Sequence, residues 1–153
     1  MTNERYQKIP MLPIHQESTH HELKVEGELP RELDGLYVRN GPNHMGEISP
    51  RHHYFSGHGM VHGVRLREGK ALWYRNRVVR GGDVAPVMNE KDIGGPILHG
   101  IDASPNTNVV TFGHTMYATI EAGASMVEMD EYLSSIRRST LNGALEFGFT
   151  GHH

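Results

Sequence analysis

The sequence predicts an all-β protein built as an antiparallel meander. Its 153 residues include 18 glycines and 8 prolines, which interrupt the chain at short intervals. This spacing is typical of short strands joined by turns, and no long helical pattern separates them. Since successive hairpins lack intervening helices, we expect antiparallel sheets in a chain of the size of one ordinary domain.

The chain has two predicted regions. Residues 1–30 are polar and are expected to form an extended N-terminal arm, and residues 31–153 form the β-rich part. The first strand expected there is Leu36–Arg39, because it is aromatic and β-branched and lies between an Asp-Gly turn and an Asn-Gly-Pro-Asn turn. Arg39, Asn40, Gly41 and Pro42 are interpreted as a structural turn and are assigned no chemistry.

A clearer hairpin follows. Alternate residues of its first strand share one face of a sheet, at Met60, His62, Val64 and Leu66. The turn over residues 67–70 leads into a second strand, Leu72–Val79.

The second half begins with residues 81–108, which have no sustained period and predict a functional or disordered loop. The hairpin expected next pairs Val109–Phe112 with Met116–Glu121. The stretch SMVEMD predicts a further strand, and EYLSSIRRST predicts one helical turn or a loop. Because a four-stranded propeller blade takes roughly 40 to 50 residues, the chain would supply about three blades. An open set of blades leaves an unpaired edge, so this organisation indicates that further blades are missing.

Composition excludes several classes of function. The 15 basic and 18 acidic residues give a formal charge of -3, so there is no electrostatic basis for binding nucleic acid or an anionic membrane. The absence of cysteine excludes disulfides, thiolate nucleophiles and Cys-ligated zinc, and fits a reducing compartment. The first thirty residues hold no apolar stretch of a signal peptide or membrane span. We therefore expect a soluble, cytoplasmic protein, and surface attachment to a membrane through an apolar patch stays open.

Histidine occurs 12 times, an excess that directs attention to metal binding. His58 and His62 are spaced like a helical chelating pair, but the glycines around them argue against a helix. On a strand the two residues lie roughly 13 Å apart, too far to share an ion. His52 and His53 would point to opposite faces of a strand. No local pair of ligands is therefore predicted, and any metal ligands must converge from distant segments.

Other catalytic motifs are absent. The sequence has no Gly-x-Ser-x-Gly, no phosphate-binding GxxxxGK[ST] and no dinucleotide fingerprint after a strand, and no two carboxylates can be paired for acid–base work. Single histidines such as His99 and His114 are expected to be turn or surface residues.

Four ordered stretches resemble the N-terminal part of the carotenoid cleavage oxygenases. They are GELPRELDGLYVRNGPN, HHYFSGHGMVHGVRLREGKALWYRNRVV, NTNVVTFGHTMYATIEAG and the closing FGFTGHH, and the resemblance runs from about Gly27 to the last residue. It implies a seven-bladed β-propeller represented here by its first portion. It also implies a non-haem iron(II) centre held by four histidines from different blades. Such enzymes split a conjugated carbon–carbon double bond with O₂ to give two carbonyl products, so an apolar polyene and O₂ are the implied partners.

The resemblance assigns roles to two residues. His152 matches the iron-ligating histidine of a Thr-Ala-His-Pro motif, although His153 stands where proline is expected. A frameshift, a truncation or an incomplete gene model would each produce this departure, and a terminal histidine without a role is the alternative. Glu121 matches a glutamate that hydrogen-bonds a ligand imidazole and supplies negative charge, and its histidine partner would lie beyond residue 153. Its alternative is an exposed hairpin residue.

The family's Phe-Asp-Gly-Asp-Gly turn is altered here. Ser56 and His58 replace its two aspartates, while Gly57 and Gly59 remain and are expected to meet the need for a positive φ.

Three interpretations follow from the sequence. The first is an iron(II) dioxygenase present only as its N-terminal portion and expected to be inactive alone. The second is a non-catalytic, β-rich interaction module that pairs its open edge with another chain. The third is a histidine-rich metal-binding protein. The substrate, whether carotenoid, apocarotenoid or stilbene-like, is not encoded in these residues.

Overall fold

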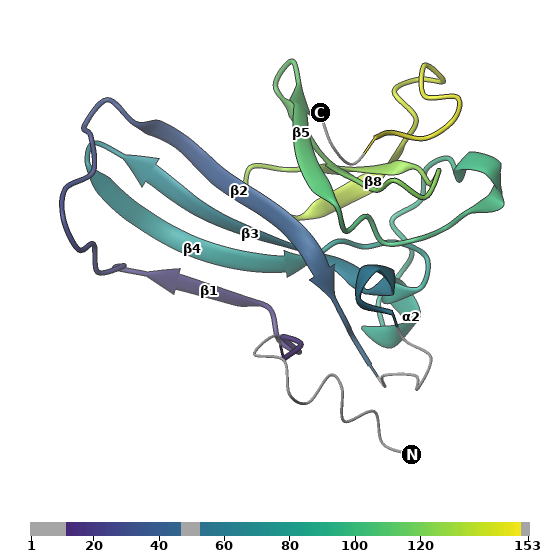
Figure 1. Cartoon of the computed structure of the whole chain (residues 1–153), viewed down its shortest axis with the longest axis horizontal. Helices are drawn as coiled ribbons and strands as arrows, with labels where there is room; N and C mark the ends of the chain where they lie inside the picture. The colour runs from purple at the N-terminus through teal and green to yellow at the C-terminus, as the bar shows by residue number, and fades with distance from the viewer. Residues whose placement is uncertain (1–11, 47–52, 151–153) are drawn as a thin grey trace.

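The computed structural model describes residues 12–46 and 53–150 and is mostly β. Eight strands form two antiparallel four-stranded sheets with the orders β1-β4-β3-β2 and β5-β6-β7-β8 (Figure 1). The first sheet contains β1 Ser18–His21, β2 Asp34–Asn43, β3 His58–Arg67 and β4 Lys70–Val78. The second contains β5 Asn108–Phe112, β6 Thr115–Thr119, β7 Met126–Met129 and β8 Ser135–Ser139.

Three short helical turns lie between the strands: η1 Tyr54–Ser56, α2 Val84–Val87 and η2 Leu98–Gly100. The last two interrupt the long connection between the sheets, where the sequence has no sustained period. Among the described residues there is no helix long and apolar enough to cross a membrane.

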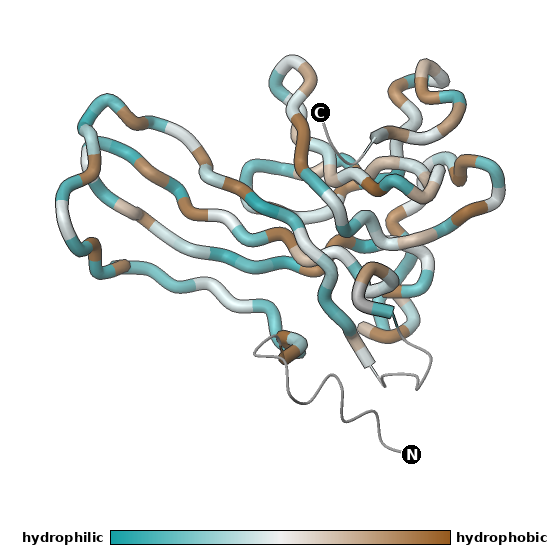
Figure 2. The backbone as a smooth tube through the Cα atoms, in the orientation of Figure 1, coloured by the Kyte–Doolittle hydropathy of each residue, from teal (hydrophilic) through white to brown (hydrophobic). Residues whose placement is uncertain are grey.

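The main core lies between the two sheets. Figure 2 shows apolar and polar residues alternating along the long strands, as expected when one face of each strand is buried. Val61 of β3 and Val79 just beyond β4 pack in one cluster with residues of the second sheet, namely Ala118, Val127 and Met129, and with Leu133 of the β7–β8 turn. Burial of these side chains at roughly 25 cal/mol per Å² of apolar surface is what holds the sheets face to face.

The predicted hairpins are confirmed, with shifted ends. β3 and β4 are antiparallel partners, and so are β5 and β6. The expected strand 36–39 is longer, because residues 40–43 continue β2 and pair with β3 down to Asn43 opposite His58. The prediction of a turn at residues 40–43 was therefore wrong. Pro42 is tolerated there because β2 lies at the edge of its sheet.

The stretch EYLSSIRRST is a turn followed by strand β8, and not a helical turn or a loop throughout. The sequence hid this strand because Arg138, a charged residue, points to the buried side. Its side chain is 4% exposed and is held by Asp92 and Asp102. A buried arginine with two carboxylate partners thus replaces the apolar residue that a strand pattern would show.

The described residues form two four-stranded sheets, where residue counting predicted about three blades. The difference arises because residues 79–107 and 140–150 contribute no strands. Part of the expected N-terminal arm is also strand, since β1 pairs with β4 from Ser18 opposite Asn76 to His21 opposite Trp73.

Gly57 and Gly59 are required by close packing and not by a positive φ, which corrects the expectation. Gly57 has φ −69°, and a Cβ there would meet the backbone of Asn43 at 2.8 Å. A Cβ at Gly59 would overlap the carbonyl oxygen of Pro105. The glycines therefore let the start of β3 pass directly against two other segments.

Candidate functional site

Glu121 lies two residues beyond the end of β6, in the turn between β6 and β7, and is exposed. His152 and His153 lie outside the described residues, so their geometry stays a prediction. The predicted strand end at Glu121 was two residues too long, because the ladder with β5 ends at Thr119 opposite Asn108. The carboxylate is thus carried on a turn at the end of a strand, where a buried sheet fixes its backbone.

The segment that leads to His152 runs against the turn that carries Glu121. Gly148 has φ +91°, and a Cβ placed on it would meet the Cα of Gly123 at 2.5 Å. Only a glycine allows both this backbone conformation and this approach. His152 follows four residues later in the sequence and lies outside the described residues.

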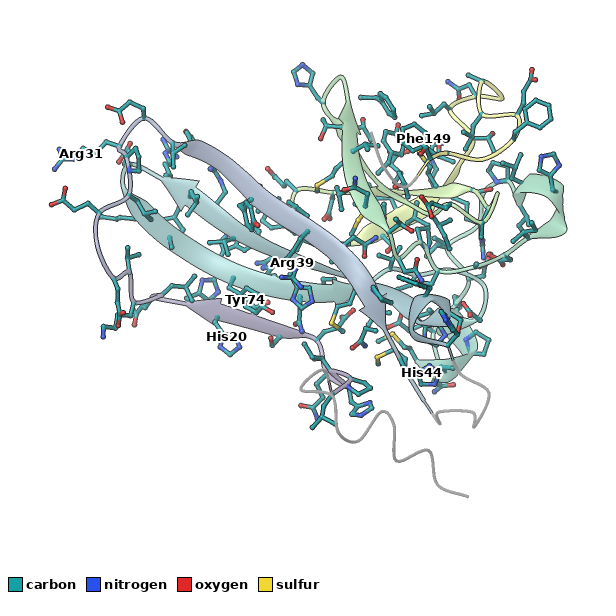
Figure 3. All side chains as sticks on the ribbon, in the orientation of Figure 1. His20, Arg31, Arg39, His44, Tyr74 and Phe149 are labelled. Atoms are coloured by element: carbon teal, nitrogen blue, oxygen red, sulfur yellow. The ribbon has the colours of Figure 1, made fainter. Side chains whose placement is uncertain are left out.

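Aromatic packing fixes the same segment from the other side. The rings of Phe149 and Phe112 meet edge to face with centroids 5.9 Å apart. Figure 3 places Phe149 in the C-terminal part, beside the hairpin of β5. Leu145 is buried in a cluster with Val110 of β5 and Met126 of β7. The last described residues therefore cover the outer face of the second sheet.

Thr119, the last residue of β6, was missed by sequence reasoning. Its side chain is fully buried, and its hydroxyl has no hydrogen-bond partner among the residues that the structure describes. Buried hydroxyls are usually paired with protein or ordered water, and the described residues supply no partner for this one. No sequence signal distinguishes it from the other threonines, because its burial depends on the second sheet.

The two residue types assigned from the sequence fit an iron(II) site only in part. An imidazole from His152 suits iron, and the Glu121 carboxylate suits the role of a hydrogen-bond acceptor that orients a ligand imidazole. Between residues 12 and 150, without 47–52, no three histidine, aspartate or glutamate side chains are grouped to hold a metal. An iron site of the kind implied by the resemblance would therefore need ligands from outside these residues.

His58 and His62 take part in different clusters, as predicted. His58 is buried, its Nδ1 accepts a hydrogen bond from the Met45 amide at 3.0 Å, and its Nε2 is 3.3 Å from Asp83. The hydrogen bond with His58 lowers the pKa of Asp83 below its usual value. The His44 ring stacks on that of His58 with centroids 5.4 Å apart. This group joins the start of β3 to the turn before α2.

His62 lies on the outer face of the first sheet. Its Nδ1 is 2.8 Å from the Tyr74 hydroxyl, and the His20 ring stacks on Tyr74 from β1 (Figure 3). Burial, and secondarily the charge of Arg39, lowers the pKa of His62. Burial also raises the pKa of Tyr74. Both groups are therefore neutral near pH 7, and they connect three neighbouring strands.

Comparison with known proteins shows the protein family to which this chain belongs. Residues 11–153 match the family model described as Retinal pigment epithelial membrane protein. A "Carotenoid cleavage oxygenase" of Mycobacterium tuberculosis is 41% identical over 145 residues, which is 93% of this chain and 29% of the relative. The Arabidopsis thaliana "Carotenoid 9,10(9',10')-cleavage dioxygenase 1" is 46% identical over 59 residues, covering 39% of this chain and 11% of the relative.

Solved structures agree on the fold. A variant of the Synechocystis apocarotenoid oxygenase superposes with a TM-score of 0.72 at 24% identity, over 90% of this chain and 32% of that one. The cobalt-substituted form of that oxygenase gives 0.71 at 25% identity, with the same coverage. The chain belongs to the carotenoid cleavage oxygenase family, and it spans less than a third of the length of these relatives.

Proposed function

We propose that this chain is the first portion of a seven-bladed β-propeller dioxygenase. With iron(II) and O₂, the complete enzyme would cleave a conjugated carbon–carbon double bond of a carotenoid, an apocarotenoid or a related polyene into two carbonyl products. Family membership over residues 11–153 supports the class of reaction. The observation that carries the site is the backbone contact of Gly148 with Gly123, which directs the segment before His152 toward the turn of Glu121.

His152 would hold iron(II) through a neutral imidazole nitrogen, together with histidines outside this chain. The bound iron supplies the redox chemistry that brings O₂ to the double bond. A neutral imidazole carries no charge. A set of histidine ligands would therefore leave the positive charge of the metal uncompensated.

Glu121 would supply negative charge from behind a ligand imidazole, without binding the metal itself. Its carboxylate accepts the N–H of a ligand imidazole, which fixes the tautomer of that ring and raises the basicity of the nitrogen on the metal. The exposure of Glu121 supports this role, because a partner from another part of the protein needs access to it.

We further propose that the complete protein works in the cytoplasm and meets its apolar substrate at a membrane surface. Phe55 is 74% exposed and Phe147 is 82% exposed. Exposed aromatic side chains of this kind support contact with an apolar partner.

The test uses this chain completed with the C-terminal remainder of the Mycobacterium tuberculosis relative. His152→Ala removes a ligand, so iron content and turnover should both collapse. Glu121→Gln keeps the shape but deletes the charge, and such changes typically cost about 10- to 100-fold in metal affinity or activity. Iron content by metal analysis and the rate of polyene cleavage are measured on the same samples.

His153→Ala is the matched control and should be nearly silent, because proline stands there in the family motif. Loss of iron in His153→Ala with retention in His152→Ala would show that the assignment is wrong by one residue. Retention of iron in both variants would refute the proposed site.

A further inference from the structure

His99 joins the long connection between the sheets to the C-terminal segment. It lies in η2, and its Nε2 is 2.6 Å from the carbonyl oxygen of Glu146. A carbonyl oxygen only accepts, so this nitrogen carries the proton and donates it. The imidazole also stacks on the Phe147 ring with centroids 6.3 Å apart and planes 26° apart. Two contacts thus connect His99 to consecutive residues of the same segment.

The backbone at His99 has an unfavourable, left-handed conformation. Its φ is 50° and its ψ is 24°, in the left-handed region that residues other than glycine seldom adopt. Such a conformation persists only where the surroundings hold it, and it is often found where a side chain must be aimed. Nothing in the amino-acid pattern of PILHG requires this conformation, since Gly100 next to it could absorb a turn.

Hydrogen bonds hold the η2 backbone to the turn that follows Glu121. The amide of Leu98 donates to the Ser125 hydroxyl at 2.9 Å, and that hydroxyl donates to the carbonyl of Pro96 at 2.7 Å. Ser125 is buried. The η2 backbone that carries His99 is therefore fixed to the turn of residues 121–125 through Ser125.

The C-terminal segment closes the arrangement by touching the same turn. Gly148 lies two residues beyond the carbonyl-bearing Glu146 and packs on Gly123. Three segments far apart in the sequence, residues 96–99, 121–125 and 145–149, are thus linked in a ring of contacts. The His99 side chain reaches the last segment by its hydrogen bond to the Glu146 carbonyl.

We propose that His99 is a positioning residue that holds residues 145–149 on the turn of Glu121 and so sets the direction in which the chain continues toward His152. The hold of His99 on residues 145–149 depends only on contacts within the chain. Its effect on the path toward His152 rests on the proposed function of His152 and Glu121. His99 touches neither substrate nor metal in this role.

Two amide variants separate the hydrogen bond from other effects. His99→Asn tolerates the left-handed backbone, but its side chain is too short to reach the Glu146 carbonyl. His99→Gln places an N–H donor about where Nε2 stands, and both variants lose the ring. His114→Ala, at an exposed histidine in the β5–β6 turn, is the matched control.

The first measurement is amide hydrogen exchange of residues 145–149 in the 153-residue chain. Loss of one hydrogen bond should raise exchange roughly two- to tenfold in His99→Asn. His99→Gln should recover most of the protection, and His114→Ala should leave it unchanged. Equal exchange in the wild type and His99→Asn would overturn the proposal, and so would equal exchange in the Asn and Gln variants.

The second measurement is the visible spectrum and the affinity of cobalt(II) in the chain completed with the Mycobacterium tuberculosis remainder. We expect His99→Asn to change the spectrum and weaken binding, and His99→Gln to restore both. A wild-type spectrum and affinity in His99→Asn would overturn the positioning role. Retention of cobalt by His152→Ala would instead refute the proposed function, while exchange would still decide whether His99 holds the segment.

Discussion

At the scale of single residues, His62 shows how a strand position sets the chemistry of a side chain. The sequence places it on one face of β3 with Met60 and Val64, and the sheet adds Tyr74 and Arg39 from the neighbouring strands. Half-burial and the nearby guanidinium both disfavour the imidazolium, and burial has the larger effect. The fold therefore favours the neutral form of the His62 imidazole.

This environment predicts a pH dependence with a definite sign. The pKa of His62 is lower in the folded chain than the value of 6.5 expected when unfolded. The unfolded state therefore binds more protons in the interval between the two values, so the stabilising contribution is complete above pH 6.5 and is lost as pH falls through the folded pKa. NMR titration of the His62 ring should give a midpoint below 6.5.

Arg39→Gln is the matched variant for that titration. The variant removes the Arg39 charge, which is the smaller cause of the lowered pKa, and keeps His62 half-buried. The titration midpoint of His62 should therefore move only part of the way back toward 6.5. A wild-type midpoint at or above 6.5 would contradict the account, as would a full return in the variant.

At the scale of elements, the start of β3 depends on glycine for space. A Cβ at Gly59 would overlap the Pro105 carbonyl oxygen, which belongs to the connection between the sheets and also accepts a hydrogen bond from Asn40. A rigid backbone atom cannot move aside as the end of a flexible side chain can. The close approach is what allows the connection to cross over β2 and β3.

Gly59→Ala should therefore destabilise the chain by about 3 kcal/mol or more, at the upper end of the usual cost of overpacking. Gly41→Ala is the control, because Gly41 lies in β2 beside the same region and nothing lies within 4 Å of its added Cβ. It should be neutral or slightly stabilising. Chemical denaturation of both variants compares the two, and equal stabilities would contradict the packing argument.

At the scale of the whole molecule, the two sheets leave edges that the further blades of the proposed propeller would cover. The second sheet has β5 and β8 as its edge strands, and Phe112 at the end of β5 is exposed. Unpaired edges and exposed apolar side chains both promote association.

The isolated 153-residue chain should therefore self-associate or bind hydrophobic dyes, and it should not cleave a polyene or a stilbene. One candidate ligand cannot hold iron(II) in the required geometry. Sedimentation with dye fluorescence, and an assay after anaerobic iron loading, test the two parts. The chain completed with the Mycobacterium tuberculosis remainder serves as the control. A compact, dye-silent monomer, or aldehyde formation above that of free iron, would contradict this view.

The sequence alone determined the class of fold, both main hairpins and the family. Turn residues and a period of two are local properties of the chain, so β3, β4, β5 and β6 were predictable within a few residues. Motif order identified the family, and it assigned Glu121 and His152 their roles as predictions. The reach of β2 through residues 40–43 was not predictable, because pairing with β3 overrides a local turn preference.

Only the tertiary structure decided which segments meet. The strand at β8 depends on Asp92 and Asp102, which neutralise Arg138 from a connection some 40 residues earlier in the chain. The buried hydroxyl of Thr119 and the contacts of His99 with the C-terminal segment likewise arise from residues distant in sequence. Burial, ion pairing and backbone contact between remote segments are properties of the packed chain, and no local pattern of amino acids encodes them.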